Sequence, residues 1–370
     1  MIRMQRAMLL LALAGAAAAA GEPDDGALRI ATWGGSYEAS QRNAYFVPFT
    51  EKTGVPIYTA AYSGGVEALR RRVQADTGSW DLADMTMADH QRACRLGYLQ
   101  RFDHRVLAPA PDGTPARRDF LEGSLTRCGV AHNVFSMVVA YDKRAFPGVR
   151  PHRIGDLFRP EQFPGVRALR KRPDALLEWA LVSYGVPPAD VYTLLSTERG
   201  MRLAFERLDR IRDDIAWWRD PEAAIELLDE ERVTFASGYN GRFFNAQVVN
   251  GRPFEIIWDA QLYQLEVWGI LANAPRPEVA RDFVRFATRT ESLERQTRYI
   301  AYGPTRTSAI RRVGEHVTTG VGMAIHMPTH PSHMDRAIEK DVAWYSSTRE
   351  TLSERFDAWL ARGGEGTGEP

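Results

Sequence analysis

Short apolar runs alternate with amphipathic segments along the first third of the chain. Such runs predict β-strands at 27–33, 55–61 and 80–85. Before the last of them, Val66, Leu69 and Val73 recur at three- and four-residue spacing, which is typical of one face of a helix. Strands that alternate with helices predict an α/β fold, in which a mainly parallel sheet has helices on both faces.

Two longer apolar stretches, 134–142 and 261–271, also have β character and stand apart from this alternation. Periodicity alone does not distinguish them from ordinary buried strands. The region between them predicts helices of its own at 175–184, 187–195 and 200–212. Beyond the second stretch, Pro277 begins a helix at 277–289, and a last helix is expected at 346–360.

The N-terminus has the pattern of a secretory signal peptide. Arg3 and Arg6 precede a short apolar run, and an alanine tract follows it and ends at Ala20. We therefore expect residues 1–20 to be removed on export, with an uncleaved weak anchor as the alternative. No cysteine follows the tract, so no lipid-attachment site is predicted. The glycine-rich tail at 364–370 is expected to be disordered.

Composition describes an exported globular protein with room for about two domains. The 370 residues are 44% hydrophobic and 25% charged, and Lys plus Arg equal Asp plus Glu at 47 each. This balance argues against a nucleic-acid partner, because nucleic-acid binders normally carry a basic excess. In an oxidising compartment the two cysteines, Cys94 and Cys128, permit one disulfide, and two buried thiols are the alternative.

Enzyme motifs and cofactor motifs are missing from the sequence. It contains no G-x-S-x-G elbow, no H-E-x-x-H, no P-loop and no G-x-G-x-x-G after a strand. His326, His330 and His333 lie close together, but Pro328 and Pro331 interrupt the helix that a metal site would need. We predict a protein that is not an enzyme, without metal or cofactor. A cleft enzyme using either cysteine and a metal-binding periplasmic protein are the alternatives.

Candidate ligand contacts lie at the carboxyl ends of the expected strands, where open α/β sheets collect ligands. They are Trp33, Gly35, Ser36, Thr86, Asp89, Tyr239, Arg242, Glu266 and Trp268. Aromatic side chains would hold an alkyl chain or an ammonium group, and a carboxylate would bind an amine.

Several of these residues have a second interpretation. Trp33 could instead pack at the strand end, and Asp89 could cap a helix. Glu266 lies within an apolar strand, where an unpaired carboxylate is costly, so an internal salt bridge is its alternative. Tyr239 follows a glycine in a turn, where core aromatics are uncommon.

The order of segments resembles the polyamine-type (spermidine/putrescine) periplasmic binding proteins of ABC transporters. The resemblance runs from Leu28 to about Gly363. It rests on LRIATWGGSY, WDLADMTMAD…RLGYLQRFD, VFSMVVAYDK, FPGVRALRKRPDALLEWAL, GVPPADVY, ASGYNGR, YQLEVWGILANAP, RDFVRFATRTE and YIAYGPT.

This resemblance implies the two-lobed periplasmic binding protein fold of type II, with the two long stretches as hinge strands. It implies lobes at 27–138 with 266–312 and at 139–265 with 313–363, and Tyr302 as a further ligand contact. The implied function is a monomeric periplasmic protein that captures a small polar solute and delivers it to an ABC permease and ATPase.

The sequence departs from the polyamine pattern at one position. Polyamine binders carry carboxylates at the start of the helix that leads into LLEWAL, and here Arg170, Lys171 and Arg172 stand there. A cationic helix start predicts an anion site, with Arg172 as a ligand contact, and a solvated basic patch is the alternative. The loop at 33–36 also lacks an acid, unless Glu38 substitutes. We therefore expect a carboxylate or zwitterion rather than a diamine.

Overall fold

Strand β1 (Leu28–Thr32) shows how the sequence sets the sheet. In the computed structural model, which describes residues 26–74 and 80–362, β1 buries Leu28 and Ile30 in one core and Ala31 in another. A strand that is apolar on both faces needs a covering layer on each side. Helices supply these layers, as the alternating pattern predicts.

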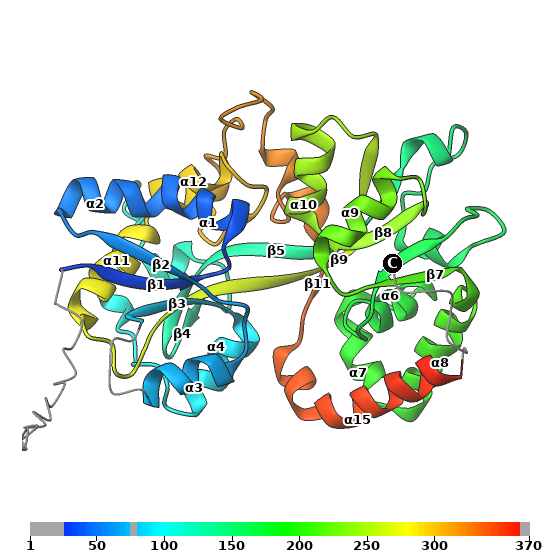
Figure 1. Cartoon of the computed structure of the whole chain (residues 1–370), viewed down its shortest axis with the longest axis horizontal. Coiled ribbons are helices and arrows are strands. Elements are labelled where there is room, and N and C mark those ends of the chain that lie inside the picture. The colour runs from blue at the N-terminus through cyan, green and yellow to red at the C-terminus, as the bar shows by residue number, and fades with distance from the viewer. Residues whose placement is uncertain (1–25, 75–79, 363–370) are drawn as a thin grey trace, which may run out of the picture.

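The first lobe has a parallel three-stranded sheet in the order β2 (Ile57–Ala61), β1, β3 (Leu82–Thr86). One face is covered by helices at α1 (Gly35–Gln41), α2 (Val47–Thr53), α11 (Pro277–Ala287) and α12 (Thr290–Thr297) (Figure 1). The other face is covered by α3 (Val66–Gln74) and α4 (Met87–Arg95). The smaller elements are α5 (Ala116–Asp119), β4 (Leu125–Thr126), β10 (Gly303–Pro304) and α13 (Thr307–Ile310).

The second lobe repeats this plan with β8 (Phe235–Tyr239), β6 (Arg167–Arg170) and β7 (Ile215–Trp218), which are parallel to one another. Its helices are α6 (Leu176–Ser183), α7 (Val191–Leu195), α8 (Glu198–Asp209), α9 (Pro221–Asp229), α10 (Asn240–Phe244), α14 (Pro331–Met334) and α15 (Val342–Ala361). A short strand, β11 (Ile338–Glu339), pairs with β9 in the middle of the molecule, and the chain then descends to α15 at the bottom of Figure 1.

Two long antiparallel strands, β5 (Gly129–Asp142) and β9 (Phe254–Ile270), run through both lobes and complete one continuous sheet (Figure 1). This confirms the predicted fold class and the two crossing strands. β9 begins seven residues before the expected 261–271, and its pairing with β5 shifts register between Met137 and Val139. Ala260 lies in this irregular part with a φ of 56°. The polar residue Asp259 interrupts the apolar pattern and conceals this earlier part of the strand in the sequence.

A disulfide joins Cys94, near the end of α4, to Cys128, between β4 and β5, with the two Cα atoms 5.9 Å apart. The predicted bridge is therefore present. It leaves neither cysteine as a free thiol, so the thiol nucleophile of the alternative cleft enzyme is not available in this state.

Three predictions are not tested by the described residues. The signal peptide and the tail lie outside them, and the lobe boundaries stay predictions. None of the helices in the described part of the chain is long and apolar enough to cross a membrane.

Candidate ligand-binding cleft

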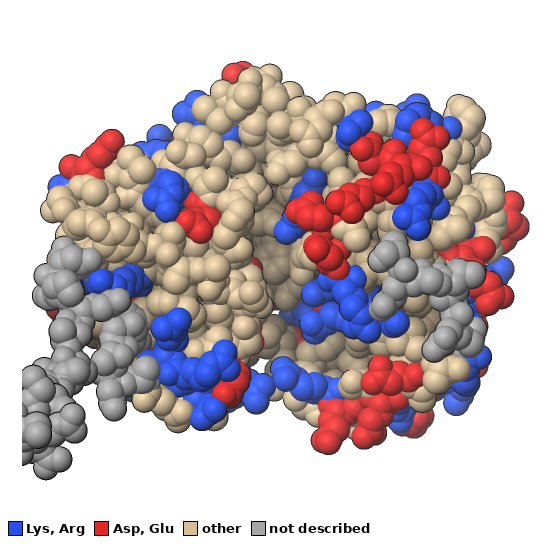
Figure 2. Space-filling model, in the orientation of Figure 1, with Lys and Arg blue, Asp and Glu red and all other residues tan. Residues whose placement is uncertain are grey.

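A cavity of about 700 Å³ lies between the lobes and is lined from both sides. It lies where the chain leaves β1, β3, β6 and β8, at the carboxyl ends of these strands. Figure 2 shows the hollow in the middle of the molecule. Five sequence-predicted residues line this cavity: Trp33, Thr86, Asp89, Arg172 and Tyr239.

Trp33 forms an aromatic wall on the side of the first lobe. Its ring lies against Tyr62, with a centroid distance of 5.3 Å, and its Nε1–H donates to Glu266 at 3.1 Å. Gly64 lets the ring lie flat against the loop, because a Cβ there would come within 3.0 Å of the indole. The indole is thus held at its edge and its face, which leaves it a fixed surface for a ligand.

Tyr239 forms the facing wall at the end of β8. Its ring packs against Phe135 of β5 with the centroids 5.8 Å apart. The Arg170 guanidinium lies 5.7 Å from the Tyr239 centroid, within the range of a cation–π contact. An aromatic surface and a positive charge are therefore adjacent on the wall that the second lobe contributes.

Asp89 lies in the first turn of α4 and accepts a hydrogen bond from Gly65 N–H at 2.8 Å. The alternative that Asp89 caps this helix is wrong, because Thr86 is the N-cap and its Oγ1 accepts from Asp89 N–H at 3.3 Å. The Asp89 carboxylate instead forms part of the cavity wall.

Glu266 lies behind Trp33 and is only 6% exposed. It is not among the residues that line the cavity. Burial raises the pKa of Glu266 well above its ordinary value, and the nearby Asp84 charge raises it further. Among the described residues Glu266 has no cationic partner, so the alternative of an internal salt bridge is not found; its side chain contacts the Trp33 indole and the Asp84 carboxyl group.

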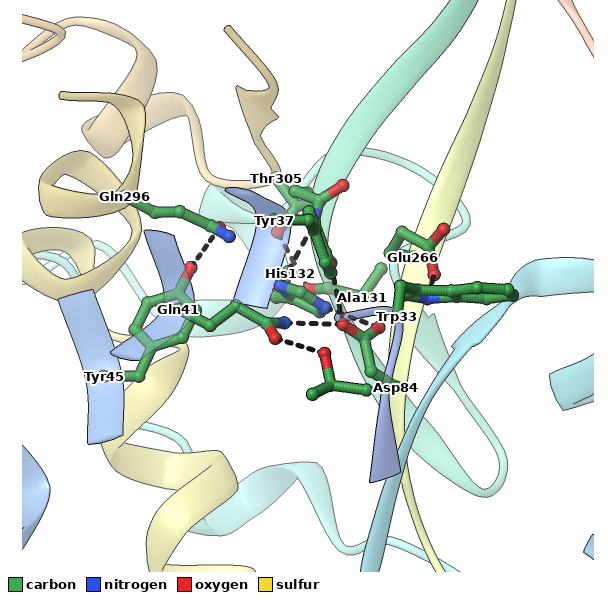
Figure 3. Close-up of polar contacts among 12 residues, drawn as sticks. Trp33, Tyr37, Gln41, Tyr45, Asp84, Ala131, His132, Glu266, Gln296 and Thr305 are labelled. Atoms are coloured by element: carbon green, nitrogen blue, oxygen red, sulfur yellow. Dashed lines mark hydrogen bonds and ion pairs between the residues drawn. The ribbon is translucent and has the colours of Figure 1, made fainter. Parts of the chain in front are cut away.

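Asp84 is the centre of a buried polar network under this wall (Figure 3). Its carboxylate accepts from Tyr37 OH at 2.7 Å and Gln41 Nε2 at 2.6 Å, and it pairs with His132 Nε2 at 3.0 Å. The His132 ring stacks on Trp268 with the centroids 4.4 Å apart. Trp268 is fully buried in the core of the first lobe, so it supports the site from behind and does not line it.

The cationic residues at 170–172 line the cavity, but they do not begin a helix as predicted. Arg170 ends strand β6, and α6 begins only at Leu176, so the prediction that they begin a helix is wrong. Buried Asp174 collects three cations, pairing with Lys340 at 2.9 Å, Arg172 at 3.1 Å and Arg170 at 3.5 Å. Burial alone would raise the pKa of Asp174, but these charges together outweigh it and lower the pKa well below the ordinary value.

The remaining predicted contacts lie outside the cavity lining. Gly35 and Ser36 form the exposed first turn of α1. Arg242 is ion-paired with Glu222 of α9. Tyr302 packs against Tyr37, with a centroid distance of 5.7 Å, and a Cβ at Gly241 would clash with its ring.

The histidine-rich segment packs against aromatic side chains. His333 stacks on Trp258 at 4.1 Å and its Nδ1 lies 2.9 Å from the Met327 carbonyl oxygen, while His326 lies 5.0 Å from the Phe244 ring. Among residues 26–74 and 80–362, no three His, Cys, Asp or Glu side chains form a group that could hold a metal ion.

The sequence model of a family described as bacterial extracellular solute-binding protein matches residues 44–324, which is more than half of the chain. The chain belongs to this family. As a solute-binding protein it is the substrate-capturing component of an ABC importer, and the family is one of transport proteins rather than enzymes.

The similar proteins agree with this assignment. The γ-aminobutyric acid-binding protein of Pseudomonas aeruginosa is 32% identical over 345 residues, covering 93% of this chain and 94% of that protein. An ABC transporter substrate-binding protein from Bradyrhizobium japonicum has 25% identity and a TM-score of 0.79, with 91% and 100% of the two chains covered. A structure described as the Atu4243 GABA receptor has 22% identity and a TM-score of 0.75, with 91% and 98% covered. None of these three proteins is described as binding a polyamine, so the polyamine type is not confirmed.

Sequence reasoning missed several lining residues of this solute-binding protein. They are Arg92, Phe135, Arg219, Lys340, Tyr345 and Arg349, while Arg170 and Lys171 were noted only as part of the basic run. Lys340, Tyr345 and Arg349 come from the last part of the chain, which returns to the cleft through β11 and α15. An exposed arginine in a helix gives no sequence signal of this placement.

Proposed function

We propose that this solute-binding protein captures an amino carboxylate, of which γ-aminobutyrate is the simplest example, in the cavity between its lobes. The observation that carries the proposal is the cluster of Arg170, Arg172 and Lys340 around a single carboxylate, that of Asp174. Three cations with one anion leave a positive excess at the cavity wall. A ligand carboxylate offsets that excess through charge-assisted hydrogen bonds.

The proposal assigns a part of the ligand to each wall. Arg170 and Arg172 take the carboxylate, because their guanidinium groups suit its planar geometry. Tyr239 and Trp33 hold the carbon chain between them by dispersion. Asp89, on the side of the first lobe, takes the ammonium group. Glu266 acts indirectly in this arrangement, because it fixes the indole of Trp33.

A diamine is less well supported than an amino carboxylate. Of the three acids that line the cavity, Asp174 is already paired with three cations, which leaves Asp89 and Asp357. A polyamine would also face seven Arg or Lys side chains in the same cavity. Repulsion from these cations would therefore weaken the binding of both amines. The 32% identical relative named for γ-aminobutyric acid supports the same preference.

The proposed location and partners of the protein are those expected for its family. After removal of residues 1–20 the mature chain would act in the periplasm as a monomer, and it would pass its ligand to the permease and ATPase of the importer. Fractionation of cells that express the full-length chain tests the location. Recovery in the osmotic-shock fluid at a mass lacking residues 1–20 supports it, and retention in the cytoplasm contradicts it.

Calorimetric titration of ligand-free protein tests which class of ligand the cavity binds. γ-Aminobutyrate should bind, and putrescine should bind at least about tenfold more weakly, the equivalent of about 1.4 kcal/mol. At a hundred times its Kd, γ-aminobutyrate should also stabilise the fold by about 2.7 kcal/mol. Tight putrescine binding with no heat from γ-aminobutyrate would overturn the proposal.

A further inference from the structure

The cavity lining is strongly cationic although the chain as a whole is balanced at 47 basic and 47 acidic residues. Seven of the lining residues are Arg or Lys, and only three are Asp. Figure 2 shows Lys and Arg side chains on both sides of the lower half of the hollow. One ligand carboxylate offsets only part of this positive charge.

The cations fall into two groups. Arg170, Arg172 and Lys340 share the Asp174 carboxylate, as described above. The second group comprises Arg92 of α4, Lys171, Arg219 and Arg349 of α15. Within the described part of the chain, Arg92, Lys171 and Arg349 form no ion pair. Other exposed arginines do so, such as Arg252 with Asp229 at 2.8 Å.

Helix starts strengthen the positive field around this second group. The first turn of α4 supplies Ala88 and Asp89 to the lining, and the first turns of α15 supply Val342, Tyr345 and Ser346. Both helices therefore direct the positive end of their dipole towards the cavity, where it favours an anion. These helices also contact each other across the lobes.

Closure of the lobes has an electrostatic cost in this arrangement. Arg92 belongs to the first lobe, whereas Lys171 and Arg349 belong to the second, and all three line one cavity. Bringing like charges together in a space that loses water is unfavourable. An anionic group placed between them removes the repulsion and turns it into attraction for both lobes.

We propose, resting on the function proposed above, that the preferred ligand is an amino dicarboxylate with a net negative charge. Its first carboxylate lies at Arg170 and Arg172, and its ammonium group lies at Asp89. Its second carboxylate lies between Arg92 and Arg349, with Lys171 beside it, and bridges the lobes. The second group of cations thus selects against neutral zwitterions that are otherwise accepted.

A homologous ligand series tests this inference by calorimetry on the full mature protein. The probes are γ-aminobutyrate, aspartate, glutamate, 2-aminoadipate and 2-aminopimelate, which cover a range of spacings between the two carboxylates. At least one dicarboxylate should bind about tenfold or more tightly than γ-aminobutyrate, with a steeper loss of affinity as salt is raised. If γ-aminobutyrate binds at least as tightly as every dicarboxylate, the inference is wrong and the proposed function stands. If none of the amino acids binds, the proposed function itself fails.

Variants on the two helices identify the second carboxylate site. Arg92→Gln and Arg349→Gln should each lower the affinity for the tightest-binding dicarboxylate about tenfold. Each should change the affinity for γ-aminobutyrate by less than about twofold. Arg95→Gln on α4 and Arg355→Gln on α15 are matched controls, because neither lines this cavity; both should bind as wild type. Equal losses for both ligand classes, or no loss for either, would overturn the placement. Circular dichroism checks that each variant is folded.

Discussion

The Trp33 indole donates its N–H to the Glu266 carboxylate at 3.1 Å, which joins the end of β1 to the long crossing strand β9. This bond satisfies the polar edge of the ring and leaves its apolar face towards the cavity. It also gives a buried acid a hydrogen-bond donor. The ligand wall and the buried polar network are therefore one connected structure.

Glu266→Gln should change the pH dependence of stability. The pKa of Glu266 is raised in the folded state by burial and by Asp84, so its contribution to stability is complete below the unfolded pKa and is lost as pH rises through the folded pKa. Glutamine does not ionise and still accepts from Trp33. The free energy of unfolding of the variant should therefore increase relative to that of wild type as pH rises above the unfolded pKa, by about 1.4 kcal/mol for each unit of pKa elevation. A difference that is constant with pH would contradict the account.

Trp33→Ala should weaken ligand binding by roughly tenfold, because it removes the aromatic wall that the first lobe contributes to the cavity. Trp33→Phe keeps an aromatic wall and should lose clearly less ligand affinity than Trp33→Ala. Trp258→Phe is a suitable control, since Trp258 stacks on His333 and does not line the cavity. If Trp33→Ala binds the ligand as tightly as wild type does, Trp33 is not part of the binding site.

Replacing both cysteines by alanine should lower the free energy of unfolding of the first lobe by about 4 kcal/mol, following the entropy of a loop of 34 residues. Urea denaturation of the double variant and of wild type, with and without reductant, measures this. Reductant should lower the free energy of unfolding of wild type to that of the variant, and it should leave the stability of the variant unchanged. A variant as stable as oxidised wild type would show that the bridge contributes nothing.

Ligand should close the lobes about β5 and β9. These are the two long strands that run through both lobes, and the cavity is lined from both sides. Small-angle scattering should give a smaller radius of gyration at saturating γ-aminobutyrate, with saturation checked by calorimetry in the same buffer. Putrescine at the same concentration serves as the control. An unchanged radius at verified saturation would argue against hinge closure.

The fold could be predicted from the sequence because its signals are local. The strand at Leu28–Thr32 and the helix begun by Pro277 follow from apolar spacing, and the crossing strands follow from long apolar runs. The site was predicted in part, because the strand-end rule found Trp33, Thr86, Asp89 and Tyr239. The network under it was not predicted, since Asp84 meets Gln41 and His132 only through distant segments.

The misplacements have physical causes as well. Arg242 follows Tyr239 closely, but its helix turns it towards Glu222 on α9. Trp268 pairs directly with Asp84 across the strands and is sealed in the core by α11, which no local pattern records. Arg170 ends a strand rather than beginning a helix, yet it still lines the cavity, because a strand end and a helix start lie at the same edge of the sheet.

Calorimetric titration of Arg172→Ala tests the central claim most directly, which is that the cations at the end of β6 bind a ligand carboxylate. Arg252→Ala is the matched control, since Arg252 is an exposed, ion-paired arginine outside the cavity. The account predicts that Arg172→Ala weakens the binding of γ-aminobutyrate by about tenfold and does not weaken the binding of putrescine. Arg252→Ala should change neither affinity. Tight putrescine binding that Arg172→Ala leaves intact or improves, with no response to carboxylates in wild type, would contradict it.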